Sequence, residues 1–182
     1  MVHTSFLVGF EEVRNVQEQE KDVMERARHD AEQGKSASTQ AGEFVREEMH
    51  HIREGKHGAQ SPEQAIAIGL SKARRAGVKL PVPKRGKVSS RTRAQAERDL
   101  RMGRRHPRHR PSKARSRSTS AALRREAKAA ASPTSLSEHA RVAARRRGGR
   151  ARHRSALKAL RTKGKAGLKR AARKAARTRR RD

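Results

Sequence analysis

Large apolar residues concentrate in one stretch of the chain, residues 43–82. Ten of them fall in these 40 positions, against nine in the 100 positions that follow. Four share one helical face at the head of the stretch: Phe44, Val45, Met49 and Ile52. Gly55 then stands where a left-handed C-terminal cap is expected. The pattern predicts a first helix that ends near Gly55.

A second helix is predicted from its capping residues. Ser61 precedes Pro62 at the first helical position, and Gln64 follows three residues after Ser61, which is the spacing of a capping box. A buried stripe is expected at Ile66, Leu70 and Ala73. Gly77 and Pro81 end the helix.

The two helices are joined by residues 55–60, which is short enough to fold them back on each other. The fold class is therefore expected to be mainly α, with an αα-hairpin head at about 43–77. Its apolar seam is small, and the chain has no cysteine to reinforce it with a disulfide or a cysteine-based zinc site. The hairpin domain, taken as 43–82, is expected to lean on a second copy, on the preceding helix or on a protein partner.

The flanking regions are polar. Residues 1–42 are acidic-leaning, and a solvent-exposed helix is predicted over 11–33, followed by a linker or cap at residues 36–42. Residues 83–182, the basic tail, are rich in Lys, Arg and Ala. We expect this tail to be largely disordered but helix-prone, with candidate helices near 90–102, 120–131 and 136–147 and a polar linker at 115–120.

A weak repeat of 16 residues begins at residue 140. Its common pattern, A-x-x-A-[A/L]-R-x-[K/R], starts at Ala140, Ala156 and Ala172. Glycines separate the units. Like charges oppose the helix in water, so nucleic-acid phosphates are expected to add helical turns to the tail.

The composition supports a chain that is only partly globular. It has no Trp or Tyr and three Phe, so the usual core anchors are scarce. The charge is uneven: residues 1–60 hold 8 Lys and Arg against 12 Asp and Glu, whereas residues 61–182 hold 40 against 6. The net charges of these two parts are −4 and +34. A segment this basic calls for a polyanionic partner.

Two segments carry a resemblance to a known family. They read GEFVREEMHHIREGKHG, from Gly42, and QAIAIGLSKARRAGV, from Gln64. They resemble a family of small basic bacterial proteins of unknown function over about residues 24–83. The resemblance implies a bacterial, cytoplasmic protein and brings no activity, cofactor or site residue. The tail is similar to linker-histone tails in composition alone.

The basic tail favours a non-enzymatic nucleic-acid-binding function through contacts with phosphates. Without zinc-finger spacing or stacking aromatics, binding of low sequence selectivity is expected. The residues predicted to contact phosphate are Lys84, Arg85, Lys87, Arg145, Arg146, Arg147, Arg150, Arg152, Arg154, Arg161, Lys163, Lys169, Arg170, Arg173, Lys174, Arg177, Arg179, Arg180 and Arg181.

Three hypotheses about the partner remain open. The first is a nucleoid-associated protein that coats duplex DNA in the bacterial cytoplasm. The second is an RNA- or ribosome-associated protein, because an arginine-rich tail serves folded RNA equally well. The third is an interaction protein whose acidic N-terminal part masks the basic tail until a partner displaces it.

The hairpin also offers candidate contacts to a protein partner or a second copy. These are Lys56, His57, Lys72, Arg74 and Arg75. The cations near the end of the second helix complement the helix dipole and add to the basic field. Specific reading of a DNA groove by this helix is the less favoured interpretation.

No enzyme, cofactor or small-molecule site is predicted, because no phosphate-binding loop, nucleophile elbow or supported carboxylate pair is evident. The histidines His50, His51, His57, His106 and His109 are expected to be surface or capping residues. Neighbours such as His50 and His51 point to different helix faces, and we see no acidic cluster at ligand spacing, so no metal site is expected. A membrane role is disfavoured by the small apolar face of the tail.

Overall fold

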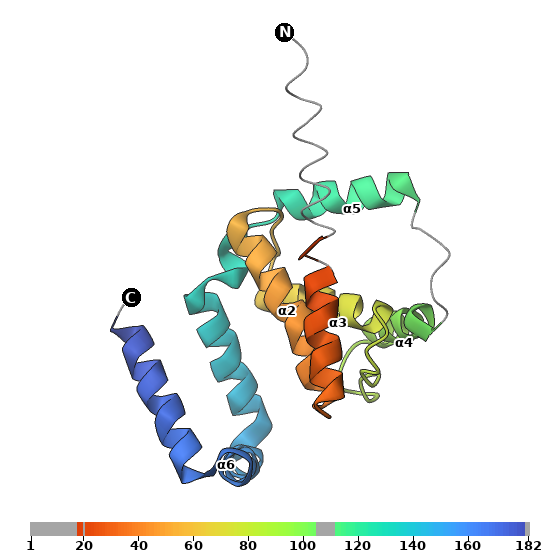
Figure 1. Cartoon of the computed structure of the whole chain (residues 1–182). Helices are drawn as coiled ribbons and strands as arrows, with labels where there is room; N and C mark the ends of the chain where they lie inside the picture. Colours follow the sequence, from red (N-terminus) through yellow and green to blue (C-terminus); the bar gives the residue numbers. More distant parts are fainter. Residues whose placement is uncertain (1–17, 20, 105–111, 181–182) are drawn as a thin grey trace. The chain divides into compact units, whose positions relative to one another are not determined.

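The computed structural model of the protein describes residues 18–19, 21–104 and 112–180, and within these the regular elements are helices, which confirms the mainly α fold class (Figure 1). A first helix, called the N-terminal helix, covers residues 21–32. It is followed by α2 (Ala37–Glu54), α3 (Pro62–Arg75), α4 (Ser90–Arg104), α5 (Lys113–Arg125), the 3₁₀ turn η1 (Lys128–Ala131) and α6 (Pro133–Arg179). The chain divides into two compact units, residues 1–136 and 137–182.

The hairpin helices end where their capping residues predict. Gly55 closes α2 in the left-handed conformation with φ 78°, which a residue with a Cβ rarely adopts. Ser61 caps α3, and its Oγ accepts a hydrogen bond from the Gln64 N–H at 3.3 Å. Helix α2 begins earlier than expected, at Ala37, because Ser36 acts as its N-cap. Of the two alternatives for residues 36–42, a linker or a cap, the cap is observed at Ser36, and residues 37–42 belong to the helix.

Small residues form the buried stripe of α3. Ala65, Gly69 and Ala73 recur at every fourth position and are buried against α2, whereas Ile66 and Leu70 lie half-buried beside them. The larger side chains flank the contact because a stripe of small residues lets two helices approach closely. Of the predicted buried stripe of Ile66, Leu70 and Ala73, only Ala73 is fully buried.

The N-terminal helix packs along α2 and belongs to the core (Figure 1). Val23 is 2% exposed and packs in one cluster with Ala27 and Phe44. Arg26 Nε pairs with Glu43 Oε2 of α2 at 3.1 Å. The predicted helix over 11–33 is observed at 21–32, whereas residues 11–17 and 20 lie outside the described residues. It is not solvent-exposed on all sides, because its apolar stripe packs against α2.

Helix α4 packs against α3, and a buried carboxylate links the two helices. Asp99 is 3% exposed, accepts a hydrogen bond from Ser71 Oγ at 2.6 Å and pairs with Arg75 Nε at 3.2 Å. The predicted helix near 90–102 is therefore observed and is part of the folded unit. The unit extends past Val82, where we placed the end of the hairpin domain.

The turn η1 completes the far end of the hairpin. Ala130 and Ala131 are buried in one cluster with Met49 and Ile52. Arg53 Nε donates a hydrogen bond to the Ala131 carbonyl oxygen at 3.0 Å. Two alanines from outside the hairpin thus complete this apolar cluster.

Helix α5 occupies the segment predicted as a polar linker at 115–120. Ser, Thr and Arg side chains do not break a helix at these positions, and the end of α5 is fixed by the hairpin turn. The Gly58 N–H donates to the Leu123 carbonyl at 2.8 Å, and the Ala59 N–H donates to the Ala127 carbonyl at 3.0 Å. The linker prediction fails because polarity alone does not exclude a helix.

Helix α6 is three helical segments in succession, as the breaks in the ribbon of Figure 1 show. Gly148 and Gly164 interrupt it with φ 72° and 64°, and they stand 16 residues apart. The segments cover 133–147, 149–163 and 165–179, so the weak sequence repeat corresponds to a structural one. No residue of α6 is buried. Among the described helices, none has the length and apolar composition that crossing a bilayer requires.

Candidate nucleic-acid interface and a buried ionic cluster

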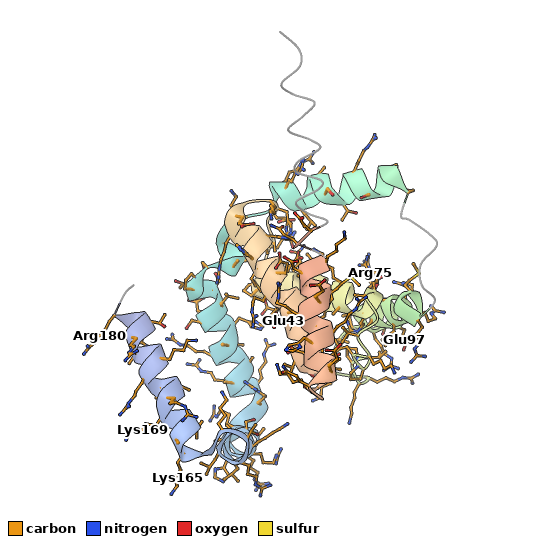
Figure 2. All side chains as sticks on the ribbon, in the orientation of Figure 1. Glu43, Arg75, Glu97, Lys165, Lys169 and Arg180 are labelled. Atoms are coloured by element: carbon orange, nitrogen blue, oxygen red, sulfur yellow. The ribbon has the colours of Figure 1, made fainter. Side chains whose placement is uncertain are left out.

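The C-terminal unit presents its cations to solvent. Residues 140–181 hold 19 Lys and Arg and no Asp or Glu, so no acid lies among these cations in the sequence. Figure 2 shows Lys165, Lys169 and Arg180 projecting from the last segment. The predicted phosphate-binding residues of this unit that the structure describes are all exposed: Arg145, Arg146, Arg147, Arg150, Arg152, Arg154, Arg161, Lys163, Lys169, Arg170, Arg173, Lys174, Arg177, Arg179 and Arg180.

The remaining predicted phosphate contacts lie elsewhere. Lys84, Arg85 and Lys87 are exposed in the connection between α3 and α4, within the first unit. Arg181 lies outside the described residues. The structure therefore gathers most of the predicted interface into the three segments of α6 and leaves a second, smaller basic turn on the folded unit.

The cations of the hairpin are engaged within the fold. Lys72 Nζ pairs with Glu48 Oε2 at 2.6 Å, Arg75 Nε pairs with Asp99 Oδ1 at 3.2 Å, and Lys56 Nζ pairs with Glu54 Oε2 at 2.8 Å. The proposed role of Lys56, Lys72 and Arg75 in a partner contact stays a prediction. Their charges are, however, already balanced by neighbouring carboxylates.

Arg74 differs from the other hairpin cations because it is buried, with 7% of its surface exposed. Its Nη2 donates to the Pro81 carbonyl at 3.4 Å, and its Nε has no hydrogen-bond partner. Burial lowers the pKa of the guanidinium, and the negative charge of Asp99 opposes that shift. Arg74 thus anchors the chain after α3, and only a rearrangement of the fold would present it to a partner.

The most buried carboxylate belongs to Glu48, at 1% exposure in the middle of α2. Three elements meet there: α2 supplies Glu48, the hairpin turn supplies His57, and the last turn of α3 supplies Lys72. Glu48 Oε1 lies 3.2 Å from His57 Nε2, but their geometry makes no hydrogen bond, and this oxygen has no partner. Glu48 Oε2 is thus paired with Lys72, whereas Glu48 Oε1 has no hydrogen-bond partner.

His51 lies three residues after Glu48 on the same face of α2, and it is 6% exposed. Its Nε2 is 3.2 Å from Glu47 Oε1, again without a hydrogen bond. Burial first, and then the positive charges of Lys72 and Lys56, lower the pKa of His51 from 6.5 to about 4. The imidazole is therefore neutral at pH 7.

The histidine predictions need a correction. His50 is exposed as expected, but His51 is buried and His57 is half-buried. The sequence shows no acidic cluster at ligand spacing, but Glu48 and His51 stand at i and i+3 on one helix face, so one carboxylate lies beside the histidines. That spacing was the signal available in the sequence. The convergence of His57 on Glu48 depends on how the turn folds, so no local pattern shows it. His106 and His109 lie outside the described residues.

Comparison with known proteins adds one finding. Residues 32–85 match the model of a family of unknown function, DUF6496. The resemblance to an uncharacterised family is thereby confirmed. The DUF6496 segment contains α2, α3 and the turn between them, and so holds Glu48, His51, His57 and Lys72. No curated protein and no solved structure matches the chain.

Proposed function

We propose that the protein is a non-enzymatic nucleic-acid-binding protein that coats duplex DNA, in the manner of a nucleoid-associated protein. The observation that carries the proposal is the C-terminal unit: three consecutive helical segments with exposed cations, no acidic residue from 140 to 181 and no buried side chain. Such a unit has little to hold it in one arrangement by itself.

Phosphates supply what the C-terminal unit lacks. Each phosphate that a Lys or Arg neutralises releases condensed counterions, and on the order of 6–10 such contacts make affinity fall about 10³–10⁵-fold between 50 and 200 mM salt. Neutralisation also removes the like-charge repulsion along each segment. Each segment of 15 residues is about 22 Å long, and the breaks at Gly148 and Gly164 let successive segments change direction along a duplex.

The chemistry of the tail favours a duplex backbone over single strands. Single-strand binders stack bases on aromatic rings, and residues 83–182 contain no Phe, Tyr or Trp. Between duplexes, B-DNA is our first choice because extended coating needs a long regular polyanion. Duplex or ribosomal RNA is the alternative partner.

The masking hypothesis receives less support from the ion pairs of the first unit. Asp30 pairs with Lys35 at 2.5 Å, and Glu54 pairs with Lys56 at 2.8 Å. Glu43 pairs with two cations, Arg26 at 3.1 Å and Arg46 at 2.9 Å. These acids are neutralised by cations of their own unit. They are therefore weak candidates for holding the basic tail.

The test uses the full chain with two matched sets of substitutions at Arg145, Arg146, Arg147, Arg150 and Arg152. In one set all five become Gln, and in the other all five become Lys. Gln and Lys have helix propensities close to that of Arg, so the sets differ mainly in charge. We expect the Gln set to weaken binding to duplex DNA more than about tenfold at 100 mM salt, and the Lys set to bind nearly as the parent does.

Equal binding of the Gln set and the parent would contradict the proposal. The choice of partner is decided by competition with duplex RNA of the same length at the same salt concentration. If RNA displaces DNA at lower concentration, the RNA-associated alternative replaces the DNA proposal.

A further inference from the structure

We propose that Glu48, His51 and His57 form a binding site for a divalent transition-metal ion, with Zn²⁺ as the ion of choice. The three ligand atoms, one carboxylate oxygen and two ring nitrogens, lie within 4.8 Å of one another. This proposal concerns the hairpin of α2 and α3 and is independent of the proposed binding of nucleic acid by the tail.

The spacing of the donors fits a small ion. Zn²⁺ binds nitrogen and oxygen ligands at about 2.0–2.2 Å, so tetrahedral ligand atoms lie about 3.3 Å apart. Glu48 Oε1 and His57 Nε2 are 3.2 Å apart. With a ring nitrogen of His51, the three ligand atoms lie within 4.8 Å of one another. Two histidines with one carboxylate form a ligand set that Zn²⁺ uses in proteins.

The second argument is that the open atoms are buried. Glu48 Oε1 and His51 Nε2 have no hydrogen-bond partner, and their side chains are 1% and 8% exposed. Leaving buried polar atoms without a hydrogen-bond partner is energetically unfavourable. One ion would satisfy both atoms.

The carboxylates of Glu48 and Glu47 offset the positive charges of Lys72 and Lys56 around the cluster. Lys72 Nζ occupies Glu48 Oε2 at 2.6 Å, so Glu48 would coordinate through Oε1 alone while Lys72 fixes the carboxylate. Glu47 Oε1 lies 3.2 Å from His51 Nε2 and brings a second negative charge to the site. His51, Glu47 and Lys72 also line a cavity of about 210 Å³, which leaves space for water beside the His51 ring.

The position of the site indicates a structural role. Its ligands come from α2 and from the hairpin turn, and Lys72 of α3 contacts one of them. An ion would therefore tie the turn to α2 in a domain whose apolar core is largely alanine. Small domains with slight cores are commonly reinforced by such an ion. Because binding to the native state alone stabilises it, added Zn²⁺ is expected to raise the Tm of the full-length protein.

The experiment titrates full-length protein, stripped of metal by a chelator, with Zn²⁺ against a chromophoric competitor, and repeats the titration with Co²⁺ as a spectroscopic probe. We expect one Zn²⁺ per chain with Kd below 1 µM, ligand-field bands typical of a tetrahedral site with Co²⁺, and a rise in Tm. His57→Ala is the main variant because His57 is only half-buried. His50→Ala is the matched control, since His50 is the exposed neighbour of His51.

We expect His57→Ala to weaken Zn²⁺ binding by at least about 100-fold, because even groups that only support a ligand change metal affinity about 10–100-fold. His50→Ala should bind as the parent does. Glu48→Gln serves as a further ligand variant, with circular dichroism as the check on its fold. Either of two results overturns the proposal: no Zn²⁺ bound by the parent below 1 µM, or equal affinities in the His57→Ala and His50→Ala variants. The cluster is then balanced by its own ion pairs.

Discussion

Gly69 of α3 lies directly against Val45 of α2: a Cβ built on Gly69 would stand 2.7 Å from Val45 Cα and 3.0 Å from its backbone nitrogen. Backbone atoms cannot swing aside as a flexible side chain can. The separation of the two hairpin helices is therefore set by the absence of a side chain at position 69. The same close approach brings Lys72 of α3 within reach of Glu48 of α2.

The first prediction concerns this contact. Gly69→Ala should destabilise the protein by about 1–2 kcal/mol, because overpacking costs about 1–3 kcal/mol and the better helix propensity of Ala returns up to about 1 kcal/mol. Urea unfolding of both proteins measures the difference. Gly42→Ala is the matched control: a Cβ there meets nothing within 4 Å, so we expect a gain of about 0.5–1 kcal/mol. A stabilised Gly69→Ala protein would show that α2 and α3 are not this close.

The second prediction concerns the docking of α4. Asp99→Asn removes the negative charge that faces Arg75. It also replaces one carboxylate oxygen with an NH₂ group, so one of the two hydrogen bonds accepted from Ser71 and Gln95 is lost. We expect a loss of about 1–3 kcal/mol in the free energy of unfolding, the usual range for a buried polar group that loses its partner.

An exposed ion pair on the same helix serves as the reference for this loss. Glu97→Gln breaks the pair with Arg93, at 3.0 Å, in which the Glu97 side chain is 46% exposed. Because solvent screens such a pair, its loss should change stability by about 0–1 kcal/mol. Equal effects of Asp99→Asn and Glu97→Gln would show that α4 does not depend on the buried carboxylate.

The third prediction concerns pH, with a chelator present. The pKa of His51 is lowered from 6.5 to about 4 in the folded protein, so the unfolded chain binds more protons between these values. The stability that the neutral ring contributes is complete above pH 6.5 and is lost as pH falls towards 4. The full difference corresponds to up to about 3 kcal/mol. The charged and titratable groups that face His51 are Lys72, Lys56, Glu48, His57 and Glu47.

Urea unfolding at pH 7, 6, 5 and 4.5 measures this dependence. Replacing His51 with Gln should flatten the fall in stability over this range, whereas replacing the exposed His50 with Gln should leave it as in the parent. If the His51→Gln protein loses stability as steeply as the parent, His51 is not buried in its neutral form.

The fourth prediction concerns the breaks in α6. Gly148 and Gly164 combine positive φ with ψ of 170° and 172°, a conformation that is essentially confined to glycine. Changing both to Ala makes the break costly and continuous helix favourable. We therefore expect more negative ellipticity at 222 nm in the complex with duplex DNA.

Gly167→Ala is the control for helix propensity, because Gly167 lies within a segment and its φ is not positive. It should increase the helical signal less than either break-site substitution does. Without DNA at low salt we expect less helical signal from the C-terminal unit than in the complex, because like charges repel along each segment. A helical signal that does not rise when DNA is added would contradict this physical account of the tail.

The sequence predicted the hairpin well because caps are local. Ser61 and Gly55 act through atoms a few residues away, so their chemistry can be read from neighbouring letters. The burial of Ala130 and Ala131 was beyond such reading, because alanine carries no local signal that distinguishes a buried site from an exposed one. The extension of the folded unit to residue 136 follows from those alanines and from Asp99, whose partners are 24 and 28 residues away.

The candidate sites divide in the same way. The exposure of the tail cations could be anticipated, since a run without acids or large apolar residues has nothing to bury it. Only part of the Glu48 cluster could be anticipated from the sequence. The spacing of Glu48 and His51 is visible in the sequence, but the approach of His57 and Lys72 requires the turn and the closely packed α3.

The most direct test of the central claim is the salt dependence of binding between the full-length protein and a fluorescent DNA duplex, measured by anisotropy from 50 to 300 mM NaCl. With on the order of 6–10 phosphates neutralised, log K should fall against log[NaCl] with a slope of about −5 to −9, and duplexes of different sequence should give similar values. A slope near zero, or binding confined to one DNA sequence, would contradict electrostatic coating by the C-terminal unit.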